Sequence, residues 1–224
     1  MAEVEFREAI RQALDEELAR DDAVIFFGED VAAAGGVFAV TPGLLERFGP
    51  ERVFDTPISE LALAGAAFGS AVAGLRPVVE IMFGDFLPLA MDSLVNQAAK
   101  YWYISNERKS VPLTVRSIVG GGGRFGAIHS QTPVAWFQGI PGLKLVAPST
   151  PADAKALLKA AIRDDNPVLV MESETLYSVK GEVPDDLDDA WRIVTPDHPI
   201  PYSPPLEDAF MPGADSIARA IRDR

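Results

Sequence analysis

Short apolar runs alternate with segments of helical period along most of this chain, and the alternation limits the fold more than any other feature. Apolar residues at helical spacing predict helices at 4–18, 86–105 and 151–163, and a fourth that starts near Ser59 and ends at Gly74. The apolar runs predict strands at 23–27, 76–83, 111–119, 144–147 and 168–171. Since strands that alternate with helices form parallel sheets, we predict an α/β fold whose parallel sheet is covered by helices on both faces.

The composition changes after Lys180. An acidic run occupies residues 185–189, and five prolines fall between 196 and 205, which is typical of an exposed strap with polyproline character. A short amphipathic helix is predicted around residues 214–221. We therefore expect one α/β domain over residues 1–184 and an irregular and helical tail over residues 185–224.

Charge and composition exclude several classes of function. The net charge of −13 disfavours binding to nucleic acid or to an anionic membrane surface. The chain has no cysteine, so disulfides, zinc–thiolate sites and thiol nucleophiles are excluded. The longest apolar run, residues 61–75, is shorter than the roughly 20 residues that span a bilayer, and the acidic N-terminus is unlike a signal or transit peptide. We expect a soluble protein of the cytoplasm.

Glu60 stands where a turn meets a helix that carries no charge. Residues 55–60 have the sequence Asp-Thr-Pro-Ile-Ser-Glu, in which Pro57 favours extended geometry before it and Ser59 is a candidate N-cap. No charged residue follows from 61 to 74. An acid in a first helical turn stabilises the helix dipole by about 0.3–1 kcal/mol. A buried acid would instead have a raised pKa that suits proton chemistry, and the spacing leaves both explanations open.

His129 is a second candidate for proton transfer. It follows a glycine-rich segment, residues 120–126, which lets a backbone come close to a ligand. Histidine titrates near neutral pH, although a lone histidine is most often structural. The glycine run lacks the Gly-Lys-Ser/Thr of a P-loop and the helix-opening pattern of a dinucleotide site. Gly65 and Gly69 lie four residues apart in mid-helix and favour close packing of a facing helix, such as one from a second subunit.

Motifs at residues 55–60 and in the helix after them, and at 83–86, 96–100, 129–131 and 162–167, occur in the order found in one protein family. Together they resemble the β subunit of the E1 components of 2-oxo acid dehydrogenases, which include pyruvate, branched-chain and acetoin dehydrogenases. The resemblance covers roughly residues 4–184. It implies a transketolase-like pyrimidine-binding domain of a thiamine diphosphate enzyme. It also implies that most of the family's second domain is missing and that the tail is its remnant.

The resemblance assigns roles to individual residues. Glu60 matches the residue that hydrogen-bonds N1′ of the cofactor's aminopyrimidine, and Ile58, Met82 and Phe86 match residues that line the aminopyrimidine pocket. His129 matches a residue of the substrate channel that assists acyl transfer to a lipoyl group. Without the resemblance, the three apolar residues would be interpreted as ordinary core.

A potassium site is implied in the same way. The family's potassium ligands, mostly backbone carbonyls, match Leu113, Ala161, Ile162, Asp164 and Asn166. Residues 161–167 are also typical, by themselves, of a helix C-terminus followed by a turn. Unpaired carbonyls there suit a hard cation, but an ordinary Asp/Asn-rich turn explains the same residues.

The partners follow from what the chain lacks. It has no Gly-Asp-Gly…Asn pattern, with which thiamine enzymes hold magnesium and the diphosphate. In the family this motif lies on a separate α subunit. The resemblance therefore implies an α2β2 heterotetramer with an E1 α subunit that holds Mg²⁺, and a lipoyl-bearing E2 that accepts the acyl group after decarboxylation of a 2-oxo acid. A non-catalytic or assembly-impaired remnant of such a subunit and a generic α/β ligand-binding domain are the alternatives.

Overall fold

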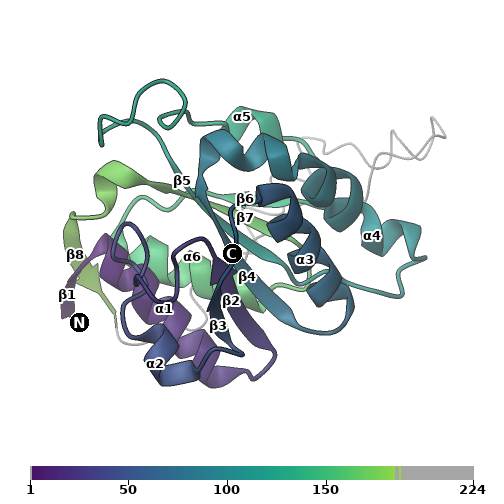
Figure 1. The fold of residues 1–224 in the computed structure, drawn as a ribbon, viewed down its shortest axis with the longest axis horizontal. Helices are drawn as coiled ribbons and strands as arrows, with labels where there is room; N and C mark the ends of the chain where they lie inside the picture. Colours follow the sequence, from purple (N-terminus) through teal and green to yellow (C-terminus); the bar gives the residue numbers. More distant parts are fainter. Residues whose placement is uncertain (1, 185–186, 188–224) are drawn as a thin grey trace, which may run out of the picture.

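The structure is a computed structural model that describes residues 2–184 and residue 187. Within this part of the chain, six parallel strands form one sheet in the order β3-β2-β4-β5-β7-β6 (Figure 1). The strands are β2 (Val24–Gly28), β3 (Val53–Asp55), β4 (Arg76–Phe83), β5 (Thr114–Val119), β6 (Lys144–Val146) and β7 (Val168–Ser173). The predicted α/β class and parallel sheet are confirmed.

Helices cover both faces of the sheet, as predicted (Figure 1). One face packs against α1 (Phe6–Arg20), α2 (Leu44–Phe48) and α6 (Pro151–Arg163). The other face packs against α3 (Glu60–Val72), α4 (Ala99–Ile104) and α5 (Val134–Phe137). The molecule therefore has three layers, with the sheet in the middle.

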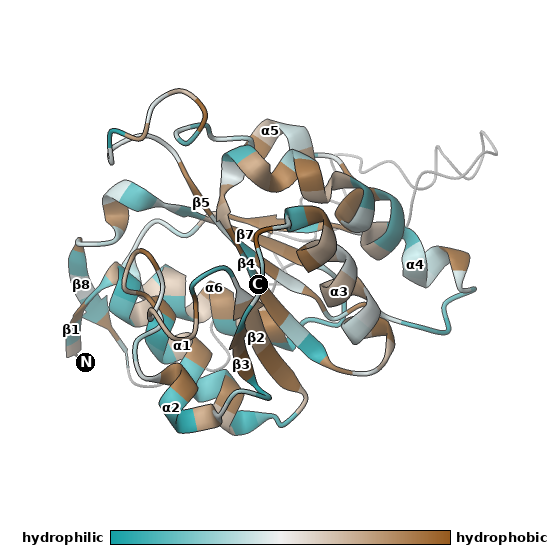
Figure 2. Cartoon of the chain, in the orientation of Figure 1, coloured by the Kyte–Doolittle hydropathy of each residue, from teal (hydrophilic) through white to brown (hydrophobic). Residues whose placement is uncertain are grey.

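The central strands are buried on both sides, so they are apolar at successive positions. Val24 and Phe26 of β2 point into the core under α1 and α6, whereas Ile25 and Phe27 point into the core under α3. In Figure 2 this strand is almost wholly brown, the colour of hydrophobic residues. A parallel sheet with both faces covered requires such a continuous run, which explains why the strand was predictable from the sequence.

The ends of two helices show how closely the sequence specifies local structure. α6 begins with a capping box, in which the Thr150 hydroxyl accepts a hydrogen bond from the N–H of Asp153, and Pro151 takes the first helical position. α3 ends at Val72, two residues before the predicted Gly74, whose φ of 106° lies in the left-handed region that glycine tolerates after a helix C-cap. Ser59 occupies the N-cap of α3 as predicted, but its side chain makes no capping hydrogen bond.

The prediction of one long helix at 86–105 is wrong. The segment is divided into a 3-10 helix, η1 (Gly84–Ala90), a π-helix, η2 (Asp92–Ala98), and the short α4. Pro88 lies inside η1 and has no N–H to donate to a preceding turn, so a regular α-helical ladder cannot run through it. Another short 3-10 helix, η3 (Glu174–Leu176), follows β7.

The predicted N-terminal helix begins too early. Val4 lies in a strand, β1 (Ala2–Glu5), which pairs antiparallel with β8 (Lys180–Val183) in a separate two-stranded sheet. In this pairing Val4 lies opposite Gly181. Local periodicity holds no information about a partner at the far end of the domain, so the strand was missed.

The predictions for the tail, an acidic strap and a helix at 214–221, lie outside the described residues except at Leu187. In the part of the chain that the structure describes, no helix is both long and apolar enough to cross a membrane.

Candidate functional site

The residues predicted to bind a cofactor lie at the carboxyl edge of the sheet. β2 ends at Gly28, β3 at Asp55 and β4 at Phe83, and β2 lies between the other two strands. The chain therefore passes from β2 to β3 on one side of it and then crosses to β4 on its other side. Ligands of open α/β sheets bind outside the carboxyl ends of the strands at such a switch point.

The run at residues 55–60 holds the end of β3 against the loop that follows β2. The Asp55 carboxylate accepts hydrogen bonds from the N–H groups of Ala32 and Ala33, at 2.7 and 3.0 Å. The Thr56 N–H donates to the carbonyl of Gly28 at 2.8 Å. Glu60 then opens α3 with only 8% of its surface exposed. The carboxylate is therefore buried at the start of the helix, as the second of the two explanations expected.

Glu29 is a functional candidate that the sequence analysis missed. It follows the last residue of β2, is 7% exposed, and its Oε1 atom has no hydrogen-bond partner among the described residues. Burial, followed by the negative charge of Glu60, raises the pKa of Glu29, and a backbone hydrogen bond from Ser59 opposes the shift. The sequence signal that could have identified Glu29 is an acid directly after a fully apolar strand. Its proximity to Glu60 depends on the strand order.

The buried acids fit a ligand with a basic ring nitrogen, such as the aminopyrimidine of thiamine diphosphate. Glu29 presents an unpaired buried oxygen and is close enough to Glu60 to be affected by its charge, and a hydrogen-bond donor on the ligand would satisfy that oxygen. The three predicted apolar pocket residues differ in exposure. Met82 and Phe86 are half-buried, whereas Ile58 is 81% exposed. The alternative interpretation, that Ile58 is an ordinary core residue, is therefore wrong.

His129 lies against the predicted pocket residue Phe86. The two rings meet edge to face with centroids 5.2 Å apart, and the Phe83 ring contacts His129 in the same way at 4.8 Å. Gly84 lies between the two phenylalanines, and a Cβ there would come within 2.7 Å of the Val119 side chain. The motif at residues 83–86 therefore needs its glycine to pack on β5 and present an aromatic ring on either side.

Asp85 and Gln131 join two of the predicted motifs directly. The Asp85 carboxylate accepts hydrogen bonds from the side-chain amide of Gln131, at 2.8 Å, and from its backbone N–H, at 3.3 Å. The Gly120 N–H donates to the Gln131 carbonyl at 3.0 Å, which closes the base of the loop that carries His129. Both residues stood in the recognised motifs, but sequence reasoning gave them no role.

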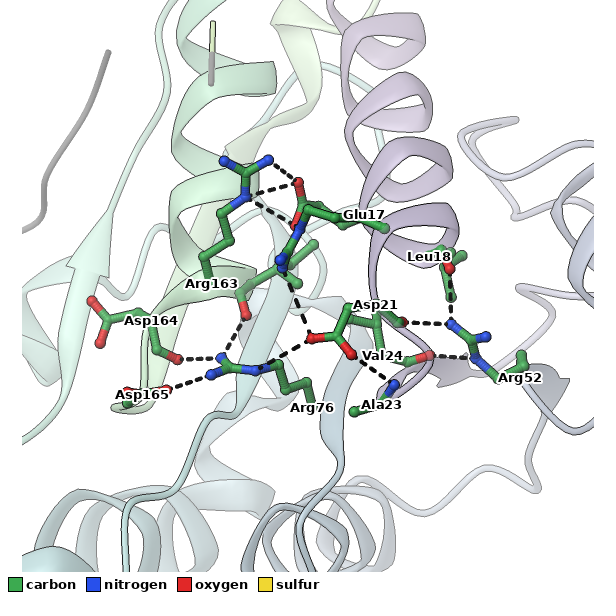
Figure 3. A network of polar contacts seen from close by, with 12 residues as sticks. Glu17, Leu18, Asp21, Ala23, Val24, Arg52, Arg76, Arg163, Asp164 and Asp165 are labelled. Carbon is green, nitrogen blue, oxygen red and sulfur yellow. Dashed lines mark hydrogen bonds and ion pairs between the residues drawn. The ribbon is translucent and has the colours of Figure 1, made fainter. Parts of the chain in front are cut away.

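The five predicted potassium ligands gather at the opposite, amino edge of the sheet, near the end of α6. The carbonyls of Ile162 and Asp164 both accept hydrogen bonds from Nη1 of Arg76, at 3.1 and 3.2 Å (Figure 3). The Leu113 carbonyl accepts from the Val168 N–H at 2.8 Å. Potassium would therefore compete with the Arg76 guanidinium for two of its oxygen ligands.

The side chains of this cluster are also paired. Nζ of Lys144 lies 2.7 Å from the Asp164 carboxylate, which in addition accepts hydrogen bonds from the backbone and side chain of Asn166. The carbonyl of Ala161 accepts from the Asp164 N–H. The structure brings the predicted ligands together, and the potassium ion itself stays a prediction.

A cavity of about 280 Å³ lies between α3 and the edge strand β3. It is lined by Phe27, Phe54, Thr56, Pro57, Ser59, Ala62, Leu63, Ala66 and Ser70. A Cβ at Gly69 would meet no described atom within 4 Å, and one at Gly65 would meet only the Ser93 hydroxyl, at 3.8 Å. Ser93 belongs to η2, so Gly65 faces a helix of the same chain, and the facing helix of a second subunit stays a prediction.

The comparisons with known proteins agree with the sequence motifs. The chain is 49% identical over 187 residues to the 2-oxoisovalerate dehydrogenase subunit beta of Bacillus subtilis (strain 168), which covers 83% of this chain and 57% of that protein. It is 47% identical over 184 residues to the mitochondrial pyruvate dehydrogenase E1 component subunit beta of Bos taurus, covering 82% and 51% of the two chains. The acetoin:2,6-dichlorophenolindophenol oxidoreductase subunit beta of Bacillus subtilis (strain 168) is 46% identical over 195 residues, covering 82% and 57%.

The chain thus spans about half the length of the curated relatives it matches. Among solved structures, a split gene transketolase, described as an inactive beta4 tetramer, has a TM-score of 0.64 at 21% identity. The likeness covers 82% of this chain and 55% of that one, and it supports the fold. Residues 2–180 match the family model of the transketolase pyrimidine-binding domain, so the chain belongs to that family.

Proposed function

We propose that this chain is the pyrimidine-binding part of the β subunit of a thiamine diphosphate-dependent 2-oxo acid dehydrogenase E1, an enzyme that decarboxylates a 2-oxo acid and transfers the acyl group to a lipoyl carrier. One observation carries the proposal: two buried acids, Glu60 and Glu29, lie at the carboxyl edge of the sheet, and Oε1 of Glu29 has no hydrogen-bond partner among the described residues. Similarity to β subunits of three such dehydrogenases and oxidoreductases supports it. Their names point to different substrates at nearly equal identity, so pyruvate, a branched-chain 2-oxo acid and acetoin all stay open.

Each proposed residue has a distinct part in this chemistry. When bound, thiamine diphosphate supplies the carbon nucleophile for decarboxylation. Glu60 holds a proton at N1′ of the aminopyrimidine, and its burial keeps water from competing for that contact. Phe86 and Met82, which are half-buried, would line the aminopyrimidine pocket, and the exposed Ile58 side chain in the turn before α3 would contribute to it as well. His129, next to Phe86, moves a proton during acyl transfer.

The proposed partners complete the site. An E1 α subunit would supply the ligands for Mg²⁺ and the diphosphate, which this sequence lacks. The small residues of α3 and the neighbouring apolar cavity suit close packing with another subunit in an α2β2 assembly. A lipoyl-bearing E2 would accept the acyl group. A potassium ion near Asp164 and a location in the cytoplasm belong to the same proposal, and residues 185–224 would be the remnant of the family's second domain.

Reconstitution tests the proposal. The chain is co-expressed with an E1 α subunit, the complex is sized by light scattering, and turnover is measured with thiamine diphosphate and Mg²⁺. Glu60→Gln keeps the size of the side chain but cannot exchange the N1′ proton, so we expect kcat to fall by about 10²–10⁴-fold with the complex intact. Glu46→Gln, on α2, is the matched control.

Wild-type turnover by a folded Glu60→Gln complex would contradict the proposed role of Glu60 as the residue that binds N1′. A complex that assembles but has no activity even with Glu60 present would favour the alternative, a non-catalytic remnant.

A further inference from the structure

Two groups of aromatic rings meet at Phe83, the last residue of β4. In one group Phe83, Phe86 and His129 all meet edge to face, with centroids 4.8–6.0 Å apart. In the other group Phe83, Phe38 and Phe125 meet in the same way, with centroids 5.6–6.1 Å apart. We call this second group the aromatic clasp. The proposed chemistry gives no role to Phe38 or Phe125.

Phe38 belongs to a well-connected loop between β2 and α2. Thr41 in this loop is fully buried, and its hydroxyl donates to the Val31 carbonyl at 2.6 Å. The same loop donates two backbone hydrogen bonds to the Asp55 carboxylate, at 2.7 and 3.0 Å. The segment that carries Phe38 is therefore fixed to the turn that leads to Glu60.

Phe38 also meets the ring of Tyr177 edge to face, with centroids 5.9 Å apart. The Tyr177 hydroxyl donates to Glu172 at 2.7 Å, and Arg116 donates two hydrogen bonds to the same carboxylate, each at 2.8 Å. Arg116 donates a third to Glu80, at 2.7 Å, and all four of these side chains are buried. Breaking such a buried ion pair would leave an uncompensated charge, so the Tyr177 ring gives Phe38 a fixed neighbour.

Phe125 connects the clasp to the loop that carries His129. This loop is glycine-rich and exposed over most of its length, so few of its side chains can pack. A Cβ at Gly123 would overlap the Phe125 ring, which therefore folds back over its own loop. The Gly123 N–H donates to the Glu174 carboxylate at 3.1 Å. Because a glycine-rich backbone has much conformational freedom to lose, these few contacts decide where His129 lies.

We propose that Phe38 is a positioning residue for His129. It acts through Phe83, whose ring contacts both of them, and through Phe125, which holds the loop. Edge-to-face pairs are directional, so each ring limits the orientation of the next. The part that His129 plays in acyl transfer rests on the proposed function, whereas its placement by the clasp is a property of the chain itself.

The test is ¹H–¹³C NMR of the histidine side chains in the 224-residue chain, with the His129 signals assigned by their loss in His129→Ala. The ring currents of Phe83 and Phe86 should displace these signals from those of a free histidine. Phe38→Leu keeps an apolar side chain without a ring, and most of the displacement should be lost. Phe38→Tyr keeps the ring and should retain it. Phe48→Leu is the matched control, since Phe48 is a partly buried phenylalanine of α2 that packs against the same core as Phe38.

Unchanged His129 signals in Phe38→Leu, an equal change in Phe48→Leu, or loss of the displacement in Phe38→Tyr overturns the proposal. If Phe38→Leu does not fold, Phe125→Leu decides in its place, because Phe125 is 43% exposed and its replacement should leave the fold intact. Phe125→Leu should also remove most of the displacement, and wild-type signals in that variant count against the clasp.

A second readout separates positioning from a general loss of structure. In the reconstituted complex, Phe38→Leu should slow acyl transfer to a lipoyl acceptor by about 10–100-fold, since a misplacement of roughly 1 Å costs about 100-fold. In a His129→Ala background the same substitution should cause no further loss, because both changes act through one group. Additive losses would mean that Phe38 acts elsewhere and would overturn the proposal. The NMR measurement needs neither cofactor nor partner, so it tests the clasp even if the proposed function fails.

Discussion

The Asp85 carboxylate and Gln131 are joined by two hydrogen bonds, at 2.8 and 3.3 Å, that connect the end of β4 to the loop carrying His129. The contact is on the surface, so its contribution to global stability is small. Its importance is positional, because the same short segment presents Phe86 to His129. The loop is thereby held over the edge of the sheet where Glu60 lies.

Asp85→Asn should loosen this loop without unfolding the domain. The amide has one acceptor oxygen in place of two, so one of the two hydrogen bonds from Gln131 is lost. We expect less than about 1 kcal/mol of global destabilisation, but faster amide hydrogen exchange over residues 121–131. Asp92→Asn is the matched control, since the Asp92 carboxylate also accepts two hydrogen bonds, from the side-chain amides of Asn96 and Gln97 in η2. Equal exchange in both variants would contradict the proposed anchoring.

His129→Ala should impair acyl transfer to a lipoyl acceptor more than decarboxylation followed with an artificial electron acceptor. The reason is its position beside Phe86 at the edge of the proposed pocket, where it can move a proton without supporting the buried carboxylates. Both assays are run on the reconstituted complex, with alanine at the other histidine, His198, as the control. Equal losses in the two assays would mean that His129 acts before acyl transfer or only in packing.

The isolated chain should bind thiamine diphosphate weakly. It offers contacts to the aminopyrimidine through Glu60 and its neighbours, but its sequence lacks the motif that ligates magnesium and the diphosphate. Charge-assisted contacts to the diphosphate are the strong ones, so most of the binding free energy should be absent. Isothermal calorimetry with the cofactor and Mg²⁺ checks this. A dissociation constant of about 1 μM or below for the purified monomer, which corresponds to roughly 8 kcal/mol, would show that one chain holds a complete site.

Glu29→Gln should change the pH dependence of stability in a predictable direction. The pKa of Glu29 is raised above its ordinary value of 4.5, first by burial and then by Glu60. The folded state therefore binds this proton more tightly than the unfolded chain does. The stabilisation is fully present below pH 4.5 and is lost as the pH rises through the raised pKa. Relative to wild type, Glu29→Gln should gain stability from pH 4.5 to neutrality in urea denaturation.

Glu8→Gln supplies a control of opposite sign. The hydrogen bond from Arg11 lowers the pKa of Glu8, so its stabilisation is present above 4.5 and is lost as the pH falls through the lowered pKa. This variant should therefore lose stability relative to wild type near neutrality and recover as the pH falls. A Glu29→Gln curve parallel to wild type at all pH values would show that Glu29 ionises normally in the folded state.

Arg76→Gln should increase any stabilisation that is specific to potassium. The Arg76 guanidinium donates to the carbonyls of Ile162 and Asp164, two of the proposed ligands, and so competes with the ion (Figure 3). Removing it frees both oxygens, although the ion pairs of Arg76 with Asp21 and Asp165 are lost as well. Thermal unfolding is compared in KCl and NaCl at equal concentration, so the general loss of stability cancels. The same K⁺–Na⁺ difference in wild type and variant would argue against a potassium site here.

Several features were determined by the sequence because their causes are local. The helix predicted at 151–163 has the observed bounds, since a capping box and a proline mark its start within four residues. The strand at 76–83 also has its observed bounds, because burial on both faces of a parallel sheet requires an apolar run. The burial of Glu60 followed from a helix without charges. Pro88 was a sequence signal against one long helix at 86–105. Periodicity alone, however, cannot show where an α-helix is replaced by a 3-10 or a π-helix.

The tertiary structure decided which chemical groups meet. Gln131 and Asp85 are 46 residues apart, Arg116 reaches Glu80 and Glu172 across 36 and 56 residues, and Arg76 contacts the end of α6 from 86 residues away. Glu29 lies near Glu60 only because β2 is placed between β3 and β4. Strand order brings together the ends of segments that are distant in sequence, and no local pattern specifies that order. The sequence by itself therefore determined the central strands, α6 and the buried acid, while the groups that surround this acid were fixed by the arrangement of the sheet.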